Sequence, residues 1–564
     1  MNFKNEIAKI LVGVTNLEFN DIVDSIEVPQ NSEMGDFAFP CFKLSKEMKK
    51  APNMIASELA EKIKPNEFIE KIEPVSGYLN FYVNKEFLAN VTLKMVIEVG
   101  ESYGKNEIGK GKTVVIDYSS PNIAKPFHIG HLRATVIGNA LYNIYKMQGY
   151  NVIGINHLGD WGTQFGKLMV AYKKYSSQEA LDKGGIKELV RIYVKFHELA
   201  EQDESLNDEA RNYLLKMQQG DKDALDLWRY FYDISMIEFN AVYDRLGTKF
   251  DYTTGESFYN EMMWPIVEEL EAKNLLVESD GAKIVDLEEA KMPPCLILRS
   301  DGGTLYPTRD ISAAKYRKET FNFDKCLYVT GLEQNLHFAQ WFKVIEFMGY
   351  DWAKDLTHIP FGMVSLKEGK LSTRAGNVIY MNDLFNEAVE KTRAIIEEKN
   401  PDLENKDEVA EAVGLGAVIF NDLYNNRIKD VVFSWERMLS FEGETAPYVQ
   451  YTHARATSIL NKAGNVDFNN IDYSILTDPA TNEIIKLLYN YSEKIAEAAN
   501  KNEPFVITRY LVSLAQAFNK FYHDNPIITE AENVKNARLV VVNSVKNILK
   551  SGLALIGIKA PNKM

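Results

Sequence analysis

The sequence predicts an α/β protein built on a parallel sheet, with an all-α part after it. Val114–Ile116 is an apolar, β-branched run with the length of a buried strand, and apolar residues at helical spacing follow over Leu132–Leu141. A second strand-like run, Val152–Ile155, is again followed by a loop. This repetition is typical of a parallel sheet, and beyond Met381 the pattern is almost wholly helical.

Length and composition predict an ordinary multidomain globular protein. The 564 residues suggest roughly three or four domains, and 46% of them are apolar and 25% charged. No apolar run is long enough for a membrane span, and the N-terminus lacks a secretory apolar core, so we expect a cytoplasmic protein. Cys41, Cys295 and Cys326 are far apart, which argues against a disulfide framework and against a zinc ribbon.

The net charge of −15 is unfavourable for a nucleic-acid partner, whose phosphates need local lysine and arginine. The C-terminal stretch from residue 535 onward, however, carries basic residues and no acid. The alternative is that these residues are only solvated helix faces. The basic residues are Lys535, Arg538, Lys546, Lys550, Lys559 and Lys563.

Residues 1–106 predict a separate small α/β domain. Helical patterns are present near Ile7–Leu17, over Ala51–Ile63 and over Val91–Val99. Tyr78–Val83 is aromatic-rich and strand-like.

The loop after the first strand has the character of a nucleotide site. His128 and His131 lie where the helix opens, three residues apart and so on one face. A helix N-terminus favours anions, and two imidazoles there can donate further hydrogen bonds to a phosphate. Gly130 lets a flat ring approach the backbone. The alternative is that the histidines are surface caps.

The second strand is followed by a tight turn, Gly159–Gly162, at the sheet edge where open α/β sheets bind ligands. The alternative is that Asp160 and Trp161 only pack against the first helix. Residues 167–293 then form a long polar stretch without a chemical constellation, which we interpret as a helical insertion. Its candidate helices are Glu188–Glu201, Asp208–Gln218, Asp223–Leu246 and Phe258–Ala272.

The sheet is expected to resume at Cys295, where Asp301–Gly303 predicts a hairpin turn between two strands. Tyr306 and Asp310 stand four apart at a helix start, so both could face one pocket. A further strand, Cys326–Thr330, precedes Glu333 and Gln334. Lys370–Arg374 then lies in a glycine-punctuated loop, which alone would be an ordinary basic loop.

Several of these motifs resemble one family. H-I-G-H at His128–His131 resembles the first signature of class I aminoacyl-tRNA synthetases, and the longer string S-S-P-N-I-A-K-P-F-H-I-G-H is similar to the form in arginyl-tRNA synthetases. Lys370–Arg374 resembles the second class signature. Gly35–Pro40 resembles the family's N-terminal extra domain, and Trp435–Thr445 with Tyr448–Leu460 resembles its helical anticodon-binding domain.

The resemblance implies four parts. We expect an N-terminal tRNA-contacting domain over residues 1–106 and a Rossmann-type catalytic domain over 107–380. Within it, about 167–293 would be a largely helical insertion with some contact to the tRNA acceptor end. A helical stem-contact segment over 381–440 and an all-α anticodon-binding domain over 441–564 would follow.

The implied activity is ATP-dependent arginylation of tRNA(Arg). L-arginine would be activated to arginyl-adenylate and transferred to the 3′ end of the tRNA, with release of pyrophosphate and AMP. Mg²⁺ should accompany ATP, held mainly by its phosphates, so no protein metal site and no zinc are expected. The family also implies a monomer, and activation that requires bound tRNA.

The resemblance also implies roles for individual residues. Asp310, beside Tyr306, would pair with the substrate guanidinium, which planar carboxylates bind best. The family often carries Glu where this chain has Asp117. The catalytic residues would be Lys125, His128, His131 and Lys370, and ATP would be bound by His128, His131 and Lys370 together with Gly130, Glu333 and Ser372. Arginine would be bound by Tyr306 and Asp310 together with Asp117, Ser120, Asn122 and Gln334. The residues expected to bind tRNA are Tyr448, Tyr451, Arg455, Arg538 and Lys546.

Two other functions remain open at this point. The first is a class I synthetase for another amino acid, or a relative that adenylates without tRNA. Asp310 with Tyr306 and the intact C-terminal part argue against it. The second is a non-catalytic RNA-binding protein that kept the fold, against which both histidines and Lys370 argue. The aromatic and basic C-terminal residues could also be bundle core and rim.

Overall fold

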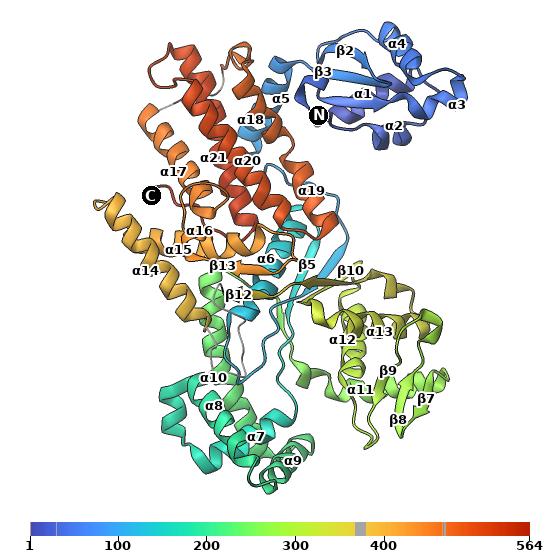
Figure 1. The fold of residues 1–564 in the computed structure, drawn as a ribbon, viewed down its shortest axis with the longest axis vertical. Helices are drawn as coiled ribbons and strands as arrows, with labels where there is room; N and C mark the ends of the chain where they lie inside the picture. The colour runs from blue at the N-terminus through green and yellow to red at the C-terminus, as the bar shows by residue number, and fades with distance from the viewer. Residues whose placement is uncertain (1, 30, 367–379, 465, 467, 469) are drawn as a thin grey trace. The chain divides into compact units, whose positions relative to one another are not determined.

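A computed structural model describes residues 2–29, 31–366, 380–464, 466, 468 and 470–564. It contains two compact units (Figure 1). The first unit comprises Met1–Tyr103, Arg455–Tyr491 and Leu514–Ile548, and the second comprises Gly104–Ala454, Ser492–Ser513 and Leu549–Met564. The last part of the chain, expected to be one helical domain over 441–564, thus contributes to both units.

The N-terminal part of the first unit is a three-stranded antiparallel sheet with helices. The expected strand is confirmed as β3, the central strand, and the expected helices are confirmed with shifted ends. Its strands are β1 (Phe37–Pro40), β2 (Ile69–Val75) and β3 (Tyr78–Val83), and its helices are α1 (Phe3–Val12), α2 (Phe19–Ser25), α3 (Ser45–Met48), α4 (Pro52–Lys62) and α5 (Lys85–Val99).

The second unit is built on a five-stranded parallel sheet in the order β11-β10-β4-β5-β6. The β4 strand is central: β10 pairs on one side of it and β5 on the other, so the strand order reverses there. Such a reversal leaves a crevice at the carboxyl ends of the strands. The strands are β4 (Thr113–Asp117), β5 (Asn151–Asn156), β6 (Tyr252–Thr253), β10 (Lys325–Gly331) and β11 (Leu356–Phe361).

Three helices pack against this sheet and bring their amino ends to its crevice. The first, α6, is buried along almost its whole length, and a Cβ on its Gly138 would lie 2.2 Å from Cβ of Tyr118. This close approach requires glycine. The helices are α6 (Leu132–Met147), α12 (Tyr306–Phe321) and α13 (Asn335–Phe347).

The stretch between β5 and Cys295 is mostly a helical bundle, as expected, and α10 runs from it back to the sheet (Figure 1). Phe258–Ala272 is only partly α-helical, because a 3-10 helix over Glu256–Met262 precedes α11. The helices are α7 (Thr163–Tyr175), α8 (Gln178–Ala200), α9 (Ser205–Gln218), α10 (Lys222–Leu246) and α11 (Met263–Ala272).

One element of this region was not expected, and the expected course of the chain after Cys295 is wrong. The insertion also contains a hairpin, β7 (Leu276–Ser279) and β8 (Ala282–Val285), whose Asp280-Gly281 turn has positive φ at both residues. In addition, β9 (Cys295–Leu298) pairs antiparallel with β8 and does not join the parallel sheet. The expected turn at Asp301–Gly303 does form after β9. Only a single β-bridge, between Leu298 and Thr304, follows it before the chain enters α12, so the expected second strand of this hairpin is absent.

The remaining described elements are helical except for one short parallel pair, β12 with β13. Within Trp435–Thr445 only the short helix α16 forms, and it ends at Met438. These elements are β12 (Val364–Leu366), β13 (Val431–Phe433), α14 (Met381–Lys399), α15 (Lys406–Leu423), α16 (Trp435–Met438), α17 (Ala446–Ala463), α18 (Pro479–Tyr489), α19 (Tyr491–Lys501), α20 (Phe505–Asp524) and α21 (Glu532–Leu555).

Candidate active site

A cavity of about 860 Å³ lies in the second unit where β4 and β10 end. It brings together most of the residues that the sequence singled out, although they come from three separate stretches of chain. The expected residues that line it are Asp117, Ser120, Asn122, His128, Gly130, His131, Tyr306, Asp310, Glu333 and Gln334.

The loop between β4 and α6 holds a strained backbone at this cavity. Ser119, Ser120 and Ala124 have φ values of 71°, 49° and 59°, a conformation that costs energy for residues other than glycine. Side chains compensate: Ser119 Oγ lies 2.8 Å from Thr135 Oγ1, and the Ala124 N–H donates to Ser235 Oγ at 2.9 Å. These hydrogen bonds hold the loop in its strained conformation at the cavity.

The two histidine rings lie side by side, with centroids 4.1 Å apart. Each Nδ1 accepts a backbone N–H: that of Gly130 reaches His128 at 3.0 Å, and that of His128 reaches His131 at 3.2 Å. In the neutral rings the proton is therefore assigned to Nε2, which leaves Nε2–H as the donor. The Gly130 N–H is thus engaged by His128 and does not point to a ligand.

Both histidines are held in the neutral form at physiological pH. Burial lowers the pKa of His131 to about 3, helped by the charges of His128 and Lys125. Burial and Lys125 also lower the pKa of His128. The pair thus donates hydrogen bonds without adding positive charge.

The floor of the cavity is a buried ion pair that the sequence did not predict. Arg317 Nη2 lies 2.8 Å from Asp117 Oδ2, and the two side chains are 1% and 8% exposed. Ser120 Oγ donates to the other Asp117 oxygen at 2.8 Å. Asp117 is therefore fixed on both oxygens, and much of its charge is already compensated.

Three further acids line the cavity: Asp310 on α12, Glu256 beside α12 and Glu333 after β10. His337 Nε2 donates to Asp310 Oδ2 at 2.5 Å. Glu256 lies 3.3 Å from Arg309, yet burial raises its pKa to about 7. Glu333 is exposed at the rim, in the 3-10 turn after β10. These acids suit a cationic ligand.

Several expected residues lie elsewhere. Lys125 is exposed and does not line the cavity, although its charge acts on both histidines. Lys370, Ser372 and Thr373 lie outside the described residues. Asp160, in the tight turn after β5, accepts hydrogen bonds from the Ser257 N–H and hydroxyl and faces a different cavity.

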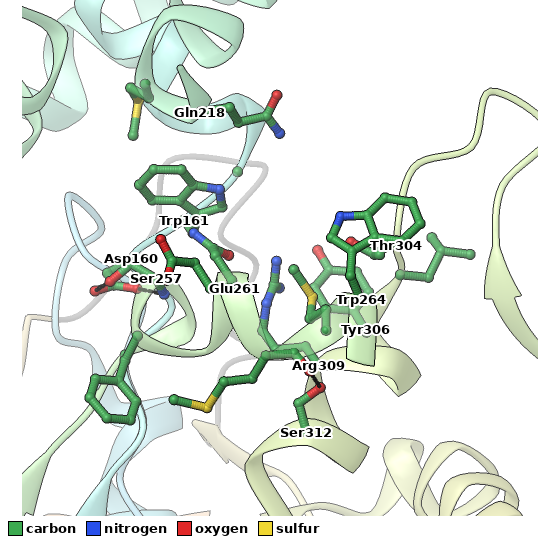
Figure 2. A pocket seen from close by; sticks show the side chains of 18 of the residues that line it. Asp160, Trp161, Gln218, Ser257, Glu261, Trp264, Thr304, Tyr306, Arg309 and Ser312 are labelled. Carbon is green, nitrogen blue, oxygen red and sulfur yellow. Dashed lines mark hydrogen bonds between the residues drawn. The ribbon is translucent and has the colours of Figure 1, made fainter. Parts of the chain in front are cut away.

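That second cavity, of about 1520 Å³, lies on the other side of Tyr306, which lines both (Figure 2). Three indoles line it, from Trp161, Trp228 and Trp264. Figure 2 shows Trp161 and Trp264 on either side of the Arg309 side chain. Trp161 and Trp228 pack edge to face with centroids 6.2 Å apart, whereas Trp264 is 52% exposed.

The expected tRNA-binding residues divide between the two units. Tyr448 and exposed Tyr451 belong to the second unit, whereas Arg455, Arg538 and Lys546 belong to the first. Within the first unit, Arg455 donates to Asn519 at 2.7 Å, and Arg538 lies 3.6 Å from Glu530. These two arginines therefore already have protein partners.

Sequence reasoning missed five charged or ionisable residues of the active cavity. Arg317 could have been found, because it lies seven residues after Asp310 and so on the same helix face. The others come from segments without a motif. They are Arg133, His157, Glu256, Arg317 and His337.

Among the residues that the structure describes, no group of three or more histidine, cysteine, aspartate or glutamate side chains could hold a metal ion. Among these residues, no helix is long and apolar enough to cross a membrane.

Comparison with known proteins agrees with this geometry. Family models match residues 92–435 (tRNA synthetases class I (R), catalytic domain), 449–564 (DALR anticodon binding domain) and 1–83 (arginyl tRNA synthetase N terminal domain). A parallel sheet with paired histidines at its crevice and the first of these matches define a class I aminoacyl-tRNA synthetase.

Individual relatives narrow the class. Arginine–tRNA ligase of Alkaliphilus metalliredigens is 54% identical over 100% of both chains, and that of Clostridioides difficile is 55% identical over 98% and 97%. The Thermus thermophilus arginyl-tRNA synthetase structure matches with a TM-score of 0.83 at 27% identity, covering 96% of each chain. The chain belongs to the arginyl-tRNA synthetases.

Proposed function

We propose that the 860 Å³ cavity is where this enzyme activates L-arginine with ATP and then transfers it to tRNA(Arg). One observation carries the assignment: neutral paired histidines and an acidic group around Asp310 face one cavity at the switch point of the sheet. The histidines suit a phosphate and the acidic group suits a guanidinium, so the phosphate and the guanidinium of arginyl-adenylate both have a partner.

In the first step an oxygen of the arginine carboxylate attacks the α-phosphorus of ATP, and pyrophosphate leaves. The Nε2–H groups of His128 and His131 would donate to the α-phosphate oxygens, where negative charge builds up. Losing one such fixed donor typically costs about 10²–10³ in rate. Lys370 and Ser372 are proposed on the family motif alone, on the departing pyrophosphate, with Gly130 and Glu333 along ATP.

Arginine would bind with its guanidinium toward Asp310 and its α-amino and carboxylate groups toward β4. His337 fixes the Asp310 carboxylate, and Glu256 offers a second acid. A bound guanidinium would lower the pKa of Glu256, which burial now raises to about 7. The polar end would contact Ser120, Asn122 and Gln334, together with Asp117.

Asp117 would mainly orient the arginine α-amino group through hydrogen bonds and would contribute little electrostatic attraction. Arg317 and Ser120 already occupy both carboxylate oxygens, so Asp117 offers directed lone pairs with little net charge. This arrangement avoids strong binding of any amine that lacks the guanidinium.

Three further features are proposed on family membership. Mg²⁺ would enter with ATP, held mainly by the phosphates. The enzyme would act as a monomer and in the cytoplasm.

Pyrophosphate exchange with each of the twenty amino acids, with and without tRNA(Arg), tests the assignment. We expect exchange with arginine alone, and only when tRNA is present. Exchange with another amino acid would contradict the substrate assignment. Exchange with arginine in tRNA-free enzyme would contradict the tRNA requirement, and no exchange under any condition would favour a binding protein without catalysis.

We further propose that the indole-lined second cavity accepts unpaired nucleotides at the tRNA 3′ end. The terminal ribose must meet the adenylate, and this cavity adjoins the active cavity at Tyr306. Indole faces stack on bases of any sequence. The cations of the cavity have acidic neighbours, Arg229 with Asp233 and Lys315 with Glu269, so stacking is the main source of affinity.

Trp264→Ala should therefore raise the KM for tRNA by about 10-fold, because stacking contributes roughly 1–3 kcal/mol per base. Trp264 is 52% exposed, so its loss leaves little core disturbed. Tyr252→Ala removes another exposed aromatic residue, one that does not line this cavity. Equal aminoacylation kinetics in both variants would remove Trp264 from the tRNA path.

A further inference from the structure

One wall of the active cavity is held by a loop outside it. The chain from Phe361 to Val364 lines the cavity. The loop over residues 426–430, between α15 and β13, wraps this wall: the Gly362 N–H donates to the Arg427 carbonyl at 2.9 Å, and the Met363 N–H donates to Asp430 Oδ1 at 2.7 Å. A Cβ on Gly362 would lie 2.5 Å from the Ile428 carbonyl oxygen, so the two segments are in full contact.

The Arg427 side chain bridges this wall to a distant turn. Its Nη1 donates to the Pro360 carbonyl at 2.7 Å, at the end of β11. Its Nε donates to the Asn502 carbonyl at 3.2 Å and lies 3.6 Å from the Glu503 carboxylate. The Arg427 and Glu503 side chains are 14% and 9% exposed, so water competes little for these contacts.

The same turn, between α19 and α20, also holds the end of the histidine helix. The Tyr145 hydroxyl, near the end of α6, lies 2.8 Å from Asn502 Oδ1 and 3.0 Å from the Ala499 carbonyl. Asn502 has a φ of 52°, the left-handed conformation that asparagine tolerates better than most residues. One turn thus contacts α6 directly and β11 through Arg427.

A second arginine reaches the wall from α6 itself. Arg133, two residues after His131, donates from Nη1 to the carbonyls of Gly362 and Lys429, both at 2.8 Å. Its Nε lies 3.3 Å from Asp422 on α15. The wall therefore lies on the histidine side of the cavity, and its position relative to the histidines depends on these buried polar contacts.

We propose that Arg427 is a positioning residue for adenylate formation. It sets the Phe361–Val364 wall against α6 and its histidines without lining the cavity. The inference rests on the proposed function, because it concerns the ATP side of that cavity. It also gives the turn at Asn502, within the region matched by the anticodon-binding family model, a part in catalysis that is separate from RNA contact.

The chemistry of the site explains why arginine is needed. One planar group donates to two carbonyls in different directions and faces a carboxylate. A lysine ammonium carries the charge but does not offer this fixed fork. Arg427→Lys is therefore expected to be impaired, although its charge is kept.

The test is pyrophosphate exchange at saturating tRNA(Arg), with the KM for ATP and for arginine measured separately. We expect Arg427→Met to raise the KM for ATP and lower kcat, together by about 10- to 100-fold, because small displacements of reacting groups cost this much. The KM for arginine, the tRNA Kd and the far-UV circular dichroism should stay near wild type. Glu503→Gln, which keeps shape and fold, should give a smaller loss in the same direction.

The matched control is Arg245→Met. Arg245, on α10, also pairs with a carboxylate far away in the sequence, that of Glu411 on α15 at 2.8 Å, and its side chain is 21% exposed, but it lies outside the active cavity. Equal kinetics in the Arg427 and Arg245 variants would overturn the proposal, and so would an equal rise in both substrate KM values. A wild-type enzyme without exchange would instead refute the proposed function.

Discussion

Replacing Asp310 by asparagine should raise the KM for arginine by about 10²–10³-fold, with little change in the KM for ATP. The asparagine keeps the shape but cannot pair with the guanidinium charge. His337 would lose its carboxylate partner, now 2.5 Å away, which adds to the disturbance. Steady-state pyrophosphate exchange with tRNA present measures both constants.

Glu346→Gln is the matched control, since it neutralises an exposed acid on the neighbouring helix α13 that lines neither cavity. Citrulline, the neutral isostere of arginine, should compete better against arginine in Asp310→Asn than in wild type. An unchanged KM for arginine would show that another acid reads the guanidinium, and Glu256 would be the first candidate.

Replacing Lys125 by alanine should lower the rate of adenylate formation by about 10²–10³-fold. The family's second signature usually has two lysines flanking its serine, but here Thr373 stands at the second position, so one cation over the triphosphate is absent. Lys125 would supply it. The Lys125 side chain is exposed and does not line the cavity, yet its charge lowers the pKa of both histidines.

A double-mutant cycle separates this role from a general loss of charge. Thr373→Lys should restore part of the rate in Lys125→Ala and change wild type little, whereas Lys112→Ala, an exposed lysine next to the other end of β4, should be neutral. Single-turnover adenylate formation is the readout. Strictly additive effects would mean that the two positions act independently.

Local pattern was enough to predict the frame of the active site. The β-branched run at Val114–Ile116 and the helical spacing after Leu132 are strong signals, and both elements form where expected. The histidine pair could be predicted because residues three apart at a helix start must lie on one face. Its protonation could not, since it depends on burial and on which backbone N–H reaches each Nδ1.

Contacts between segments that lie far apart in the sequence could not be predicted from local sequence patterns. Helical spacing could place Arg317 on the same face as Asp310. Its contact with Asp117, however, arises only because α12 packs against the sheet. The position of β9 was predicted wrongly because an apolar strand can have the same sequence pattern in a parallel and in an antiparallel sheet. Only the Asp280-Gly281 turn upstream indicates the hairpin that β9 joins. Which segments far apart in the sequence pair with one another can be seen only in the three-dimensional fold.

A crystal structure with a non-hydrolysable sulfamoyl analogue of arginyl-adenylate is the most direct test. We expect the guanidinium against Asp310, the α-amino group near Asp117 and Asn122, and the group that replaces the phosphate within hydrogen-bond distance of Nε2 of His128 or His131. A guanidinium at Asp117, or an adenylate outside the 860 Å³ cavity, would contradict the proposed site.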